Sequence, residues 1–368
     1  MDLPATPASS NSTVVPDPRR LLVMRLGSMG DILHTLPAVA ALRRAYPEAT
    51  IGWVVEERWA ELLCVLSEPR FGPRSPRRPL VDCVHTVDTK RWRTALLSLQ
   101  TWERIAAAGS ELRAHRYEIA ADFQGAVKSA LCAYWSGAPA IYGFAQPRET
   151  VASMLYTRRV GARGIHIIEQ NLSLAEAVAR RPLPFAPAEL PRDEAADKYC
   201  ADWLLRQAIE NFLVMNPGAG WGAKQWPAER YGRVARQLRE DGLHPLINVG
   251  PGEELLARAV EGASGGTARV LNLSLAQLIA FTRRARLFIG GDTGPMHLAA
   301  SLGVPVVALF GPTNPARNGP FGTRSVVLRS PSSPTSHTRR AEPDPGLLEI
   351  GVDQVTSAAR RLLEVSRG

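Results

Sequence analysis

The stretch LLVMRLGSMGDILHTLP (residues 21–37) combines an apolar run, a glycine-rich turn and the start of a helical pattern. Leu21–Met24 is typical of a buried strand, and the apolar residues from Ile32 to Leu42 recur every three or four positions, as on a helix. Because proline is best tolerated in the first turn of a helix, we expect the regular helix to begin near Pro37. Strand, turn and helix in this order predict the opening unit of a parallel α/β sheet.

The same alternation of short apolar runs and amphipathic stretches continues along the chain and predicts parallel sheets with helices on both faces. At 368 residues the chain is too long for one ordinary core, which indicates two domains. A proline-rich stretch at 180–196 is the candidate linker, and the pattern starts again after it. We predict a disordered arm (1–19), two α/β domains (20–185 and 186–345) and a C-terminal helix (346–368).

The formal net charge of +9 favours an anionic partner, which could be nucleic acid, an anionic membrane face or a phosphorylated small molecule. The four cysteines form no CxxC pair, and no cysteine–histidine set has zinc spacing, which indicates a reducing compartment rather than a disulfide framework. No apolar run reaches the ~18 residues of a membrane span, and the first residues lack the apolar core of a signal peptide. We therefore expect a cytosolic protein that can contact a membrane surface.

Three glycine-rich turns follow strands in the second half: NPGAGWGAKQWP, NVGPGEE and GGDTGPMHLAA. Ligands of open parallel sheets bind beyond the carboxyl ends of the strands, and a helix N-terminus suits a diphosphate. The amides of Thr293 and Gly294 would lie near such an anion, and Lys224 would supply a cation. Glu253 or Glu254 could accept hydrogen bonds from ribose hydroxyls. Together these features predict a nucleotide site, although each turn alone could be purely structural.

Several of the singled-out residues also have a structural interpretation. Asp292 could be only a helix N-cap, and His297 could be a packed core histidine. Asp31, at the start of the first helix, could likewise be only a cap. If the two domains face one cleft, however, Asp31 could act across it as a general base on an acceptor hydroxyl.

Basic residues gather in the first half and leave two functional interpretations open. Lys90, Arg91 and Arg93 surround Trp92 in TKRWRTALL, and Arg148 follows later. They could form a solvated basic face or bind an anionic acceptor, since arginine matches carboxylates and phosphates. Interleaved basic and aromatic residues can also grip single-stranded nucleic acid, but the chain has no recognised nucleic-acid-binding motif. The arginine-rich loop at 73–79 is either solvated or a membrane-docking segment.

Taken together, six segments resemble glycosyltransferase family 9, the ADP-heptose:lipopolysaccharide heptosyltransferases. The resemblance extends from Leu21 to Arg329 and rests on SMGDILHTLP, WVVEERWAEL, DFQGAVKSAL, RETVASMLYTRR, KQWPAERY and DTGPMHLAASLGVPVVALFGPTNP. The KRWR and RETVASMLYTRR stretches favour the branch of the family that adds the first heptose to Kdo in the lipopolysaccharide inner core.

This resemblance implies a GT-B architecture, an α/β fold in which two Rossmann-like domains face a central cleft. It implies an inverting transfer from ADP-heptose, held by the C-terminal domain, to Kdo-lipid A, with no cofactor and no metal in the site. We expect a monomer that works at the cytoplasmic face of the inner membrane and does not bind nucleic acid. The alternatives are a transferase for the second heptose or for another ADP-sugar, and a basic nucleotide- or nucleic-acid-binding protein without catalysis.

The resemblance also implies residue roles. Asp31 matches the catalytic base, and Lys224 matches the lysine beside the donor phosphates. The implied donor-binding residues are Ala219, Gly220, Lys224, Glu253, Glu254, Leu273, Asp292, Thr293, Gly294 and His297. The implied acceptor-binding residues are Lys90, Arg91, Arg93 and Arg148. Ala219 and Gly220 stand where a close relative has hydroxyl side chains, so only backbone contacts are expected from them.

Overall fold

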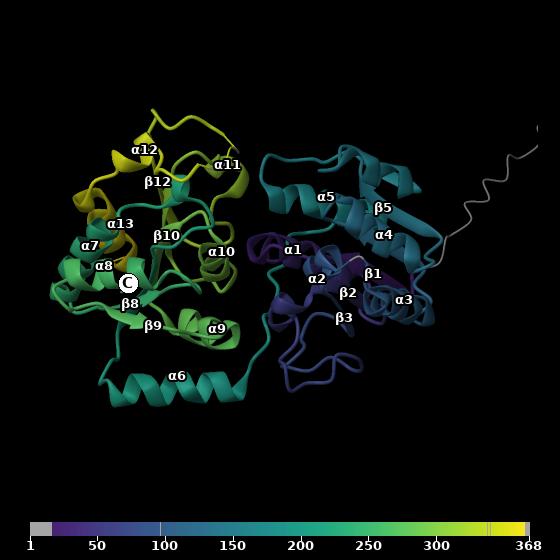
Figure 1. Ribbon diagram of the computed structural model, residues 1–368, viewed down its shortest axis with the longest axis horizontal. Helices are drawn as coiled ribbons and strands as arrows, with labels where there is room; N and C mark the ends of the chain where they lie inside the picture. The colour runs from purple at the N-terminus through teal and green to yellow at the C-terminus, as the bar shows by residue number, and fades with distance from the viewer. Residues whose placement is uncertain (1–16, 96, 337, 339, 365–368) are drawn as a thin grey trace, which may run out of the picture.

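The computed structural model describes residues 17–95, 97–336, 338 and 340–364. It consists of two lobes that lie side by side (Figure 1). The first lobe extends from β1 to α5 and the second from α6 to α13. Most of the predicted arm, residues 1–16, lies outside the described residues.

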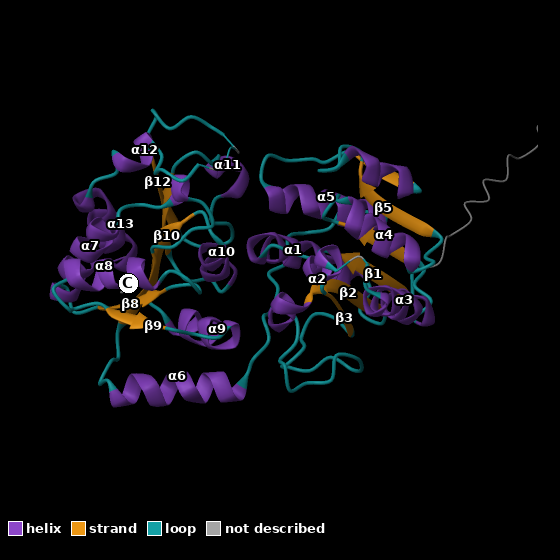
Figure 2. Ribbon diagram, viewed as in Figure 1, coloured by secondary structure: helices purple, strands orange, loops and turns teal. Residues whose placement is uncertain are grey.

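Each lobe contains a six-stranded parallel sheet in the described part of the chain. The strand orders are β3-β2-β1-β4-β5-β6 and β12-β11-β10-β7-β8-β9. Counted within each lobe, both follow the Rossmann order 3-2-1-4-5-6, with helices on both faces (Figure 2). The predicted α/β fold with two Rossmann-like domains is therefore confirmed.

The elements of the first lobe follow the expected alternation. They are β1 (Arg20–Met24), α1 (Met29–Ala45), β2 (Thr50–Glu56), the 3₁₀ helix η1 (Glu57–Leu62), β3 (Cys83–Val87), α2 (Thr89–Thr94), α3 (Leu99–Ala114), β4 (Ile119–Asp122), α4 (Val127–Trp135), β5 (Ala140–Phe144), η2 (Thr150–Leu155), β6 (Arg158–Val160) and α5 (Ile167–Ala179).

The second lobe repeats this alternation and ends in two helices. Its elements are α6 (Glu194–Arg206), β7 (Phe212–Asn216), η3 (Gly222–Lys224), α7 (Ala228–Glu240), β8 (His244–Asn248), α8 (Glu254–Ala263), β9 (Arg269–Leu271), α9 (Leu275–Arg284), β10 (Leu287–Gly291), α10 (Gly294–Ser301), β11 (Val306–Phe310), α11 (Pro315–Asn318), β12 (Ser325–Arg329), α12 (Pro345–Leu348) and α13 (Val352–Glu364).

The central strands are apolar throughout because helices cover both faces of each sheet. All residues of β7, β10 and β11 are buried, as expected for parallel strands in the middle of a sheet. The last helix, α13, packs Val355, Ala359 and Leu362 into the core of the second lobe. None of the described helices combines the length and apolar character needed to cross a bilayer.

Helix α1 differs from the sequence prediction, because it begins at Met29 and Pro37 lies inside it. The start is fixed by a capping box in which the Asp31 carboxylate accepts a hydrogen bond from the Ser28 backbone N–H. Pro37 leaves only the Leu33 carbonyl without its helical donor. Burial on almost every side offsets this loss, because α1 packs against the first sheet, α5 and α10 (Figure 1).

The two lobes share part of one hydrophobic core. Leu298 of α10 and Leu278 and Ile279 of α9 belong to the same buried cluster as Leu33 and Leu36 of α1. Residues 180–193 of the predicted linker form no helix or strand, whereas its last three residues belong to α6, which begins at Glu194.

The arginine-rich loop is organised internally, so the docking hypothesis is wrong for Arg78. That side chain is 1% exposed, and its guanidinium donates to the carbonyls of Pro69, Pro73 and Val81. Apart from an isolated bridge between Ser75 and Arg78, the loop has little regular structure, and the Arg78 guanidinium satisfies its backbone acceptors from within.

Candidate active site

A cleft of about 890 Å³ opens between the two lobes. The first lobe contributes the turns that follow β1, β4 and β5, and the second lobe contributes the turns after β7, β10 and β11. All six turns lie at carboxyl ends of parallel strands, which is where this class of sheet binds ligands.

Asp31 lines this cleft and caps α1 at the same time. Its Oδ2 atom accepts a hydrogen bond of 3.0 Å from the Ser28 N–H, and its Oδ1 atom lies 3.1 Å from Nη2 of Arg25. The Asp31 side chain is nevertheless 40% exposed. The carboxylate therefore caps the N-terminus of α1 and still faces the cleft.

Arg25 supports Asp31 from beneath and was not singled out in the sequence. Its Nε donates to the Asp31 carbonyl at 3.2 Å, and its guanidinium also donates to the Phe123 carbonyl. Burial lowers the pKa of Arg25 despite the opposing effect of Asp31 and Asp122. Its position as a charged residue directly after a buried strand is the sequence feature that could have identified it.

In the second lobe, Lys224 and Asp292 form a buried ion pair beside the cleft. Lys224 Nζ lies 2.6 Å from Asp292 Oδ2 and 4.6 Å from the centre of the Trp221 ring. Burial raises the pKa of Asp292, but the hydrogen bond and charge of His297 and the charge of Lys224 outweigh it and hold the pKa well below its usual range. Asp292 is therefore ionised and holds Lys224, which also donates to the Asp292 carbonyl, at the wall of the cleft.

A chain of hydrogen bonds continues from Asp292 into the other lobe. Asp292 Oδ1 lies 3.2 Å from His297 Nε2, and His297 Nδ1 lies 3.0 Å from His34 Nε2. Burial, followed by the charge of His297, lowers the pKa of His34 well below its ordinary value. Because the Asp292 carboxylate can only accept, His297 Nε2 donates to Asp292, and His297 Nδ1 shares the remaining proton of the pair with His34 Nε2. We call these four residues, from His34 to Lys224, the interlobe chain.

The structure brings together eight of the residues singled out in the sequence. The cleft is lined by Asp31, Arg148, Gly220, Lys224, Asp292, Thr293, Gly294 and His297. Thr293 is the N-cap of α10, so the Gly294 N–H at the start of this eight-residue helix lies at the same cleft as Asp31, while the next residue is a proline without an N–H.

Other predicted donor residues do not line the cleft. Glu253 accepts from the Gly250 N–H at 2.7 Å and lies over Gly218, where a Cβ would come within 2.1 Å of its Oε2. Glu254 is exposed and accepts from the Gly252 N–H. The Ala219 carbonyl accepts from Gln225 Nε2, and Leu273 packs against the hydrophobic clusters of both lobes.

Of the predicted acceptor-binding residues, only one lines the cleft. Arg148 is exposed at the cleft, whereas Lys90, Arg91 and Arg93 lie exposed on α2, outside the residues that line it. Helix α2 follows the carboxyl end of β3, so it stands at the same edge of the first sheet as Asp31.

Sequence reasoning missed several cleft residues besides Arg25 and His34. Trp221, Thr313 and Arg317 all line the cleft. The Thr313 hydroxyl is buried without a hydrogen-bond partner, which marks it as a candidate ligand contact. Each of these residues follows a strand end, and that position was the usable signal.

Comparisons with known proteins agree with this geometry. Residues 105–346 match the description "Glycosyltransferase family 9 (heptosyltransferase)". Lipopolysaccharide heptosyltransferase 1 of Pseudomonas aeruginosa is 33% identical over 320 residues, which cover 84% of each chain. Lipopolysaccharide heptosyltransferase 1 of Escherichia coli K12 is 28% identical, and the match covers 85% of this chain and 94% of the E. coli protein.

The fold comparison gives the same answer. The structure of the E. coli heptosyltransferase WaaC with ADP superimposes with a TM-score of 0.75 at 27% identity, covering 93% of this chain and 99% of that one. The predicted resemblance is therefore confirmed, and with it the GT-B arrangement. The chain belongs to glycosyltransferase family 9, the heptosyltransferase family, and is an enzyme of the glycosyltransferase class.

Proposed function

We propose that this chain transfers heptose from ADP-heptose to the Kdo of Kdo-lipid A with inversion of the anomeric centre, using Asp31 as the general base. The observation that carries the proposal is that Asp31 and Lys224 line one cleft from opposite lobes. A carboxylate on one side and a cation with free helix amides on the other suit an acceptor hydroxyl and a departing diphosphate.

In the proposed reaction the acceptor hydroxyl gives its proton to the Asp31 carboxylate. Its oxygen forms a bond to the anomeric carbon while the bond from that carbon to the diphosphate oxygen breaks. ADP departs with the electron pair from the face opposite the attack, which produces inversion. Lys224 and the amides at Thr293 and Gly294 stabilise the charge that develops on the diphosphate. Arg25 and Ser28 hold the Asp31 carboxylate in place.

The substrates are supported by the named relatives. ADP is bound in the similar WaaC structure. The heptosyltransferase 1 relatives are 33% and 28% identical to this chain, and heptosyltransferase 2 of E. coli is 26% identical, which favours the first transfer over the second. Arg148 in the cleft suits an anionic acceptor such as the Kdo carboxylate.

We further propose that the enzyme acts as a monomer, without a cofactor or active-site metal, at the cytoplasmic face of the inner membrane. The net charge of +9 supports attraction to an anionic surface. Lys90, Arg91 and Arg93 are exposed, and we propose that they contact the phosphates of the acceptor.

The deciding experiment compares two acceptors with purified ADP-heptose. We expect transfer to Kdo-lipid A and none to an acceptor that already carries the first heptose, with no rate increase on adding Mg²⁺ or Mn²⁺. Transfer only to the heptosylated acceptor would assign the second step instead. No transfer from any ADP-sugar, with salt-dependent binding of oligonucleotides, would overturn the enzymatic proposal.

A further inference from the structure

A cluster of metal-ligating side chains lies in the first lobe, away from the cleft. Cys83 and His85 belong to β3, and His115 follows α3. The Cys83 sulfur and one ring nitrogen from each histidine all lie within 4.8 Å of one another. We propose that Cys83, His85 and His115 bind a divalent transition metal of the zinc type that ties the edge strand β3 to the end of α3. The proposal is independent of the proposed transfer reaction.

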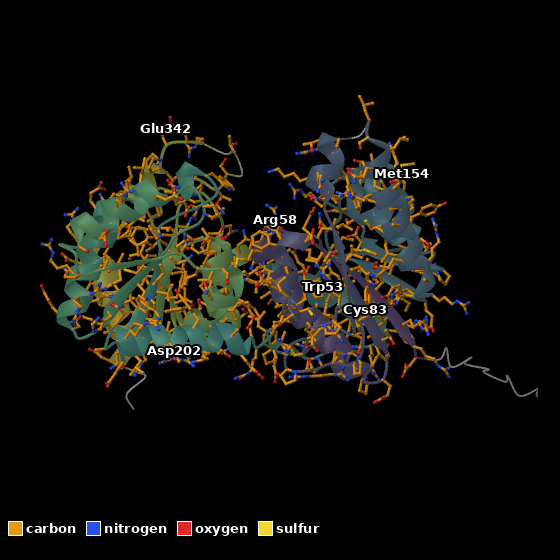
Figure 3. The ribbon with its side chains drawn as sticks, turned by 60° about the horizontal axis from the view of Figure 1, so that its bottom comes forward. Trp53, Arg58, Cys83, Met154, Asp202 and Glu342 are labelled. Atoms are coloured by element: carbon orange, nitrogen blue, oxygen red, sulfur yellow. The ribbon has the colours of Figure 1, made fainter. Side chains whose placement is uncertain are left out.

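The fold places the three ligands on one side of an edge strand. Residues two apart on a strand point to the same face, so Cys83 and His85 face α3 together. His115 is the C-cap of α3, and its ring lies 4.9 Å from that of His85. Phe71, whose backbone bridges to Cys83, packs its ring 5.4 Å from His85 and 5.3 Å from His115. Figure 3 places Cys83 well away from the second lobe, farther than Arg58.

The distances suit a tetrahedral site. Cys83 Sγ lies 3.8 Å from His115 Nδ1. Around one zinc ion, a sulfur at ~2.3 Å and a nitrogen at ~2.0 Å lie about 3.5 Å apart. A small inward movement of the three side chains would therefore bring them to bonding distance. Thiolate with imidazole is the donor set that zinc and cobalt prefer.

His85 has the orienting partner that metal-bound histidines usually have. Its Nδ1 lies 2.5 Å from Oε1 of Glu111, which fixes the proton on that nitrogen and leaves Nε2 as the ligand atom. Nε2 lies 2.7 Å from the Tyr117 hydroxyl. This hydroxyl or a water would complete four-coordination.

The chemical environment is also suitable. Cys83 and His85 are buried, so a metal held there is largely shielded from solvent. On binding, the Cys83 thiol gives its proton to solvent and its sulfur lone pair forms the metal bond, with no electron transfer. Among the described residues this is the one such group of three, and the other buried cysteines have no comparable partners.

The test is a cobalt titration of the full chain after removal of bound metal. We expect about one equivalent of Co²⁺ to bind with the visible bands of tetrahedral cobalt and a near-ultraviolet sulfur-to-cobalt charge-transfer band, and Zn²⁺ to displace it. Cys83→Ser should abolish the charge-transfer band, and His115→Ala should abolish tight binding. Cys132→Ser, which changes a buried cysteine without such partners, should bind as the parent does.

A milder variant keeps the test decisive if those substitutions impair folding. Glu111→Gln retains all three ligands at a half-exposed position, and we expect its Co²⁺ affinity to fall about 10–100-fold. Absence of stoichiometric cobalt binding by the parent chain would overturn the proposal. An unchanged charge-transfer band in folded Cys83→Ser would overturn it as well, whatever the result of the transfer assay.

Discussion

His34 Nε2 lies 3.0 Å from His297 Nδ1, and this contact joins α1 of the first lobe to α10 of the second. Because His297 also contacts Asp292, and Asp292 contacts Lys224, a residue of the first lobe helps to position the cation of the second. The donor side of the cleft is thus assembled by both lobes.

Replacing His34 tests this dependence. In His34→Ala the buried Nδ1 of His297 loses its hydrogen-bond partner, and we expect the free energy of unfolding to fall by about 1–3 kcal/mol. We also expect a weaker apparent affinity for ADP, because Asp292 and Lys224 lose their support. Denaturant unfolding and ADP titration measure the two effects. His244→Ala, at the start of β8, is the matched control and should leave ADP affinity unchanged.

The pH dependence of stability follows from the lowered pKa of His34. An unfolded histidine takes up a proton near pH ~6.5, whereas His34 resists protonation in the folded protein. Its contribution is therefore complete above that pH and is lost as the pH falls through and below it. We expect the parent to lose stability between pH 7 and 5 more steeply than His34→Gln in thermal unfolding. Parallel slopes would contradict the lowered pKa.

Asp31→Asn separates the base from the helix cap. The amide oxygen can still accept from the Ser28 N–H, so we expect the fold and the ADP affinity to remain nearly intact. Without a base, turnover should fall ~10²–10⁴-fold. Asp193→Asn, at the N-cap of α6, is the control and should turn over normally. Parent-like turnover of Asp31→Asn in a steady-state assay would show that Asp31 is not the base.

Lys224→Ala should impair donor binding and rate together. A hydrogen bond to a charged group contributes ~1.5–3 kcal/mol, so ADP affinity should fall by roughly 10–100-fold. Asp292 would also be left buried with only His297 beside it. Calorimetry with ADP and single-turnover kinetics measure the two effects. If both stayed at parent values, Lys224 would have no part in holding the diphosphate.

Two glycine substitutions give a matched pair in helices. A Cβ on Gly30 would lie 2.9 Å from Cδ2 of His297, so Gly30→Ala should displace that ring and cost ~1–3 kcal/mol of stability. In Gly109→Ala of α3 the nearest atom lies 3.8 Å from the new Cβ, and we expect a gain of ~0.4–1 kcal/mol. Thermal unfolding ranks the two, and equal melting temperatures would contradict the packing of Gly30 on His297.

The sequence predicted the sheets because buried parallel strands such as β7 and β11 are continuous apolar runs. It failed at α1, where Pro37 suggested a later start, because local propensity does not register burial on every side. It identified Asp31, Lys224 and Asp292 from their places after strands and suggested a base and a diphosphate cation for the first two, and the family resemblance selected these roles over the structural alternatives. His34 could not be paired with His297, 263 positions away, without coordinates.

The cysteine cluster shows a second limit of sequence patterns. No cysteine–histidine set has the spacing of a zinc motif, yet Cys83, His85 and His115 converge in the structure. A strand supplies two of them at alternate positions, and the third follows after two intervening helices, α2 and α3. Such a site follows from the tertiary fold, which spacing rules do not encode.

The packing of α1 also constrains how the enzyme can move. Leu298 of α10 shares a buried cluster with Leu33 and Leu36. Moving the lobes apart would expose this apolar surface to water, which costs ~25 cal/mol of free energy per Å². A small rotation about an axis near α1 would expose less of that surface than a hinge opening would. We therefore expect donor and product to exchange through a small rotation of the two lobes about α1, rather than through a wide hinge opening.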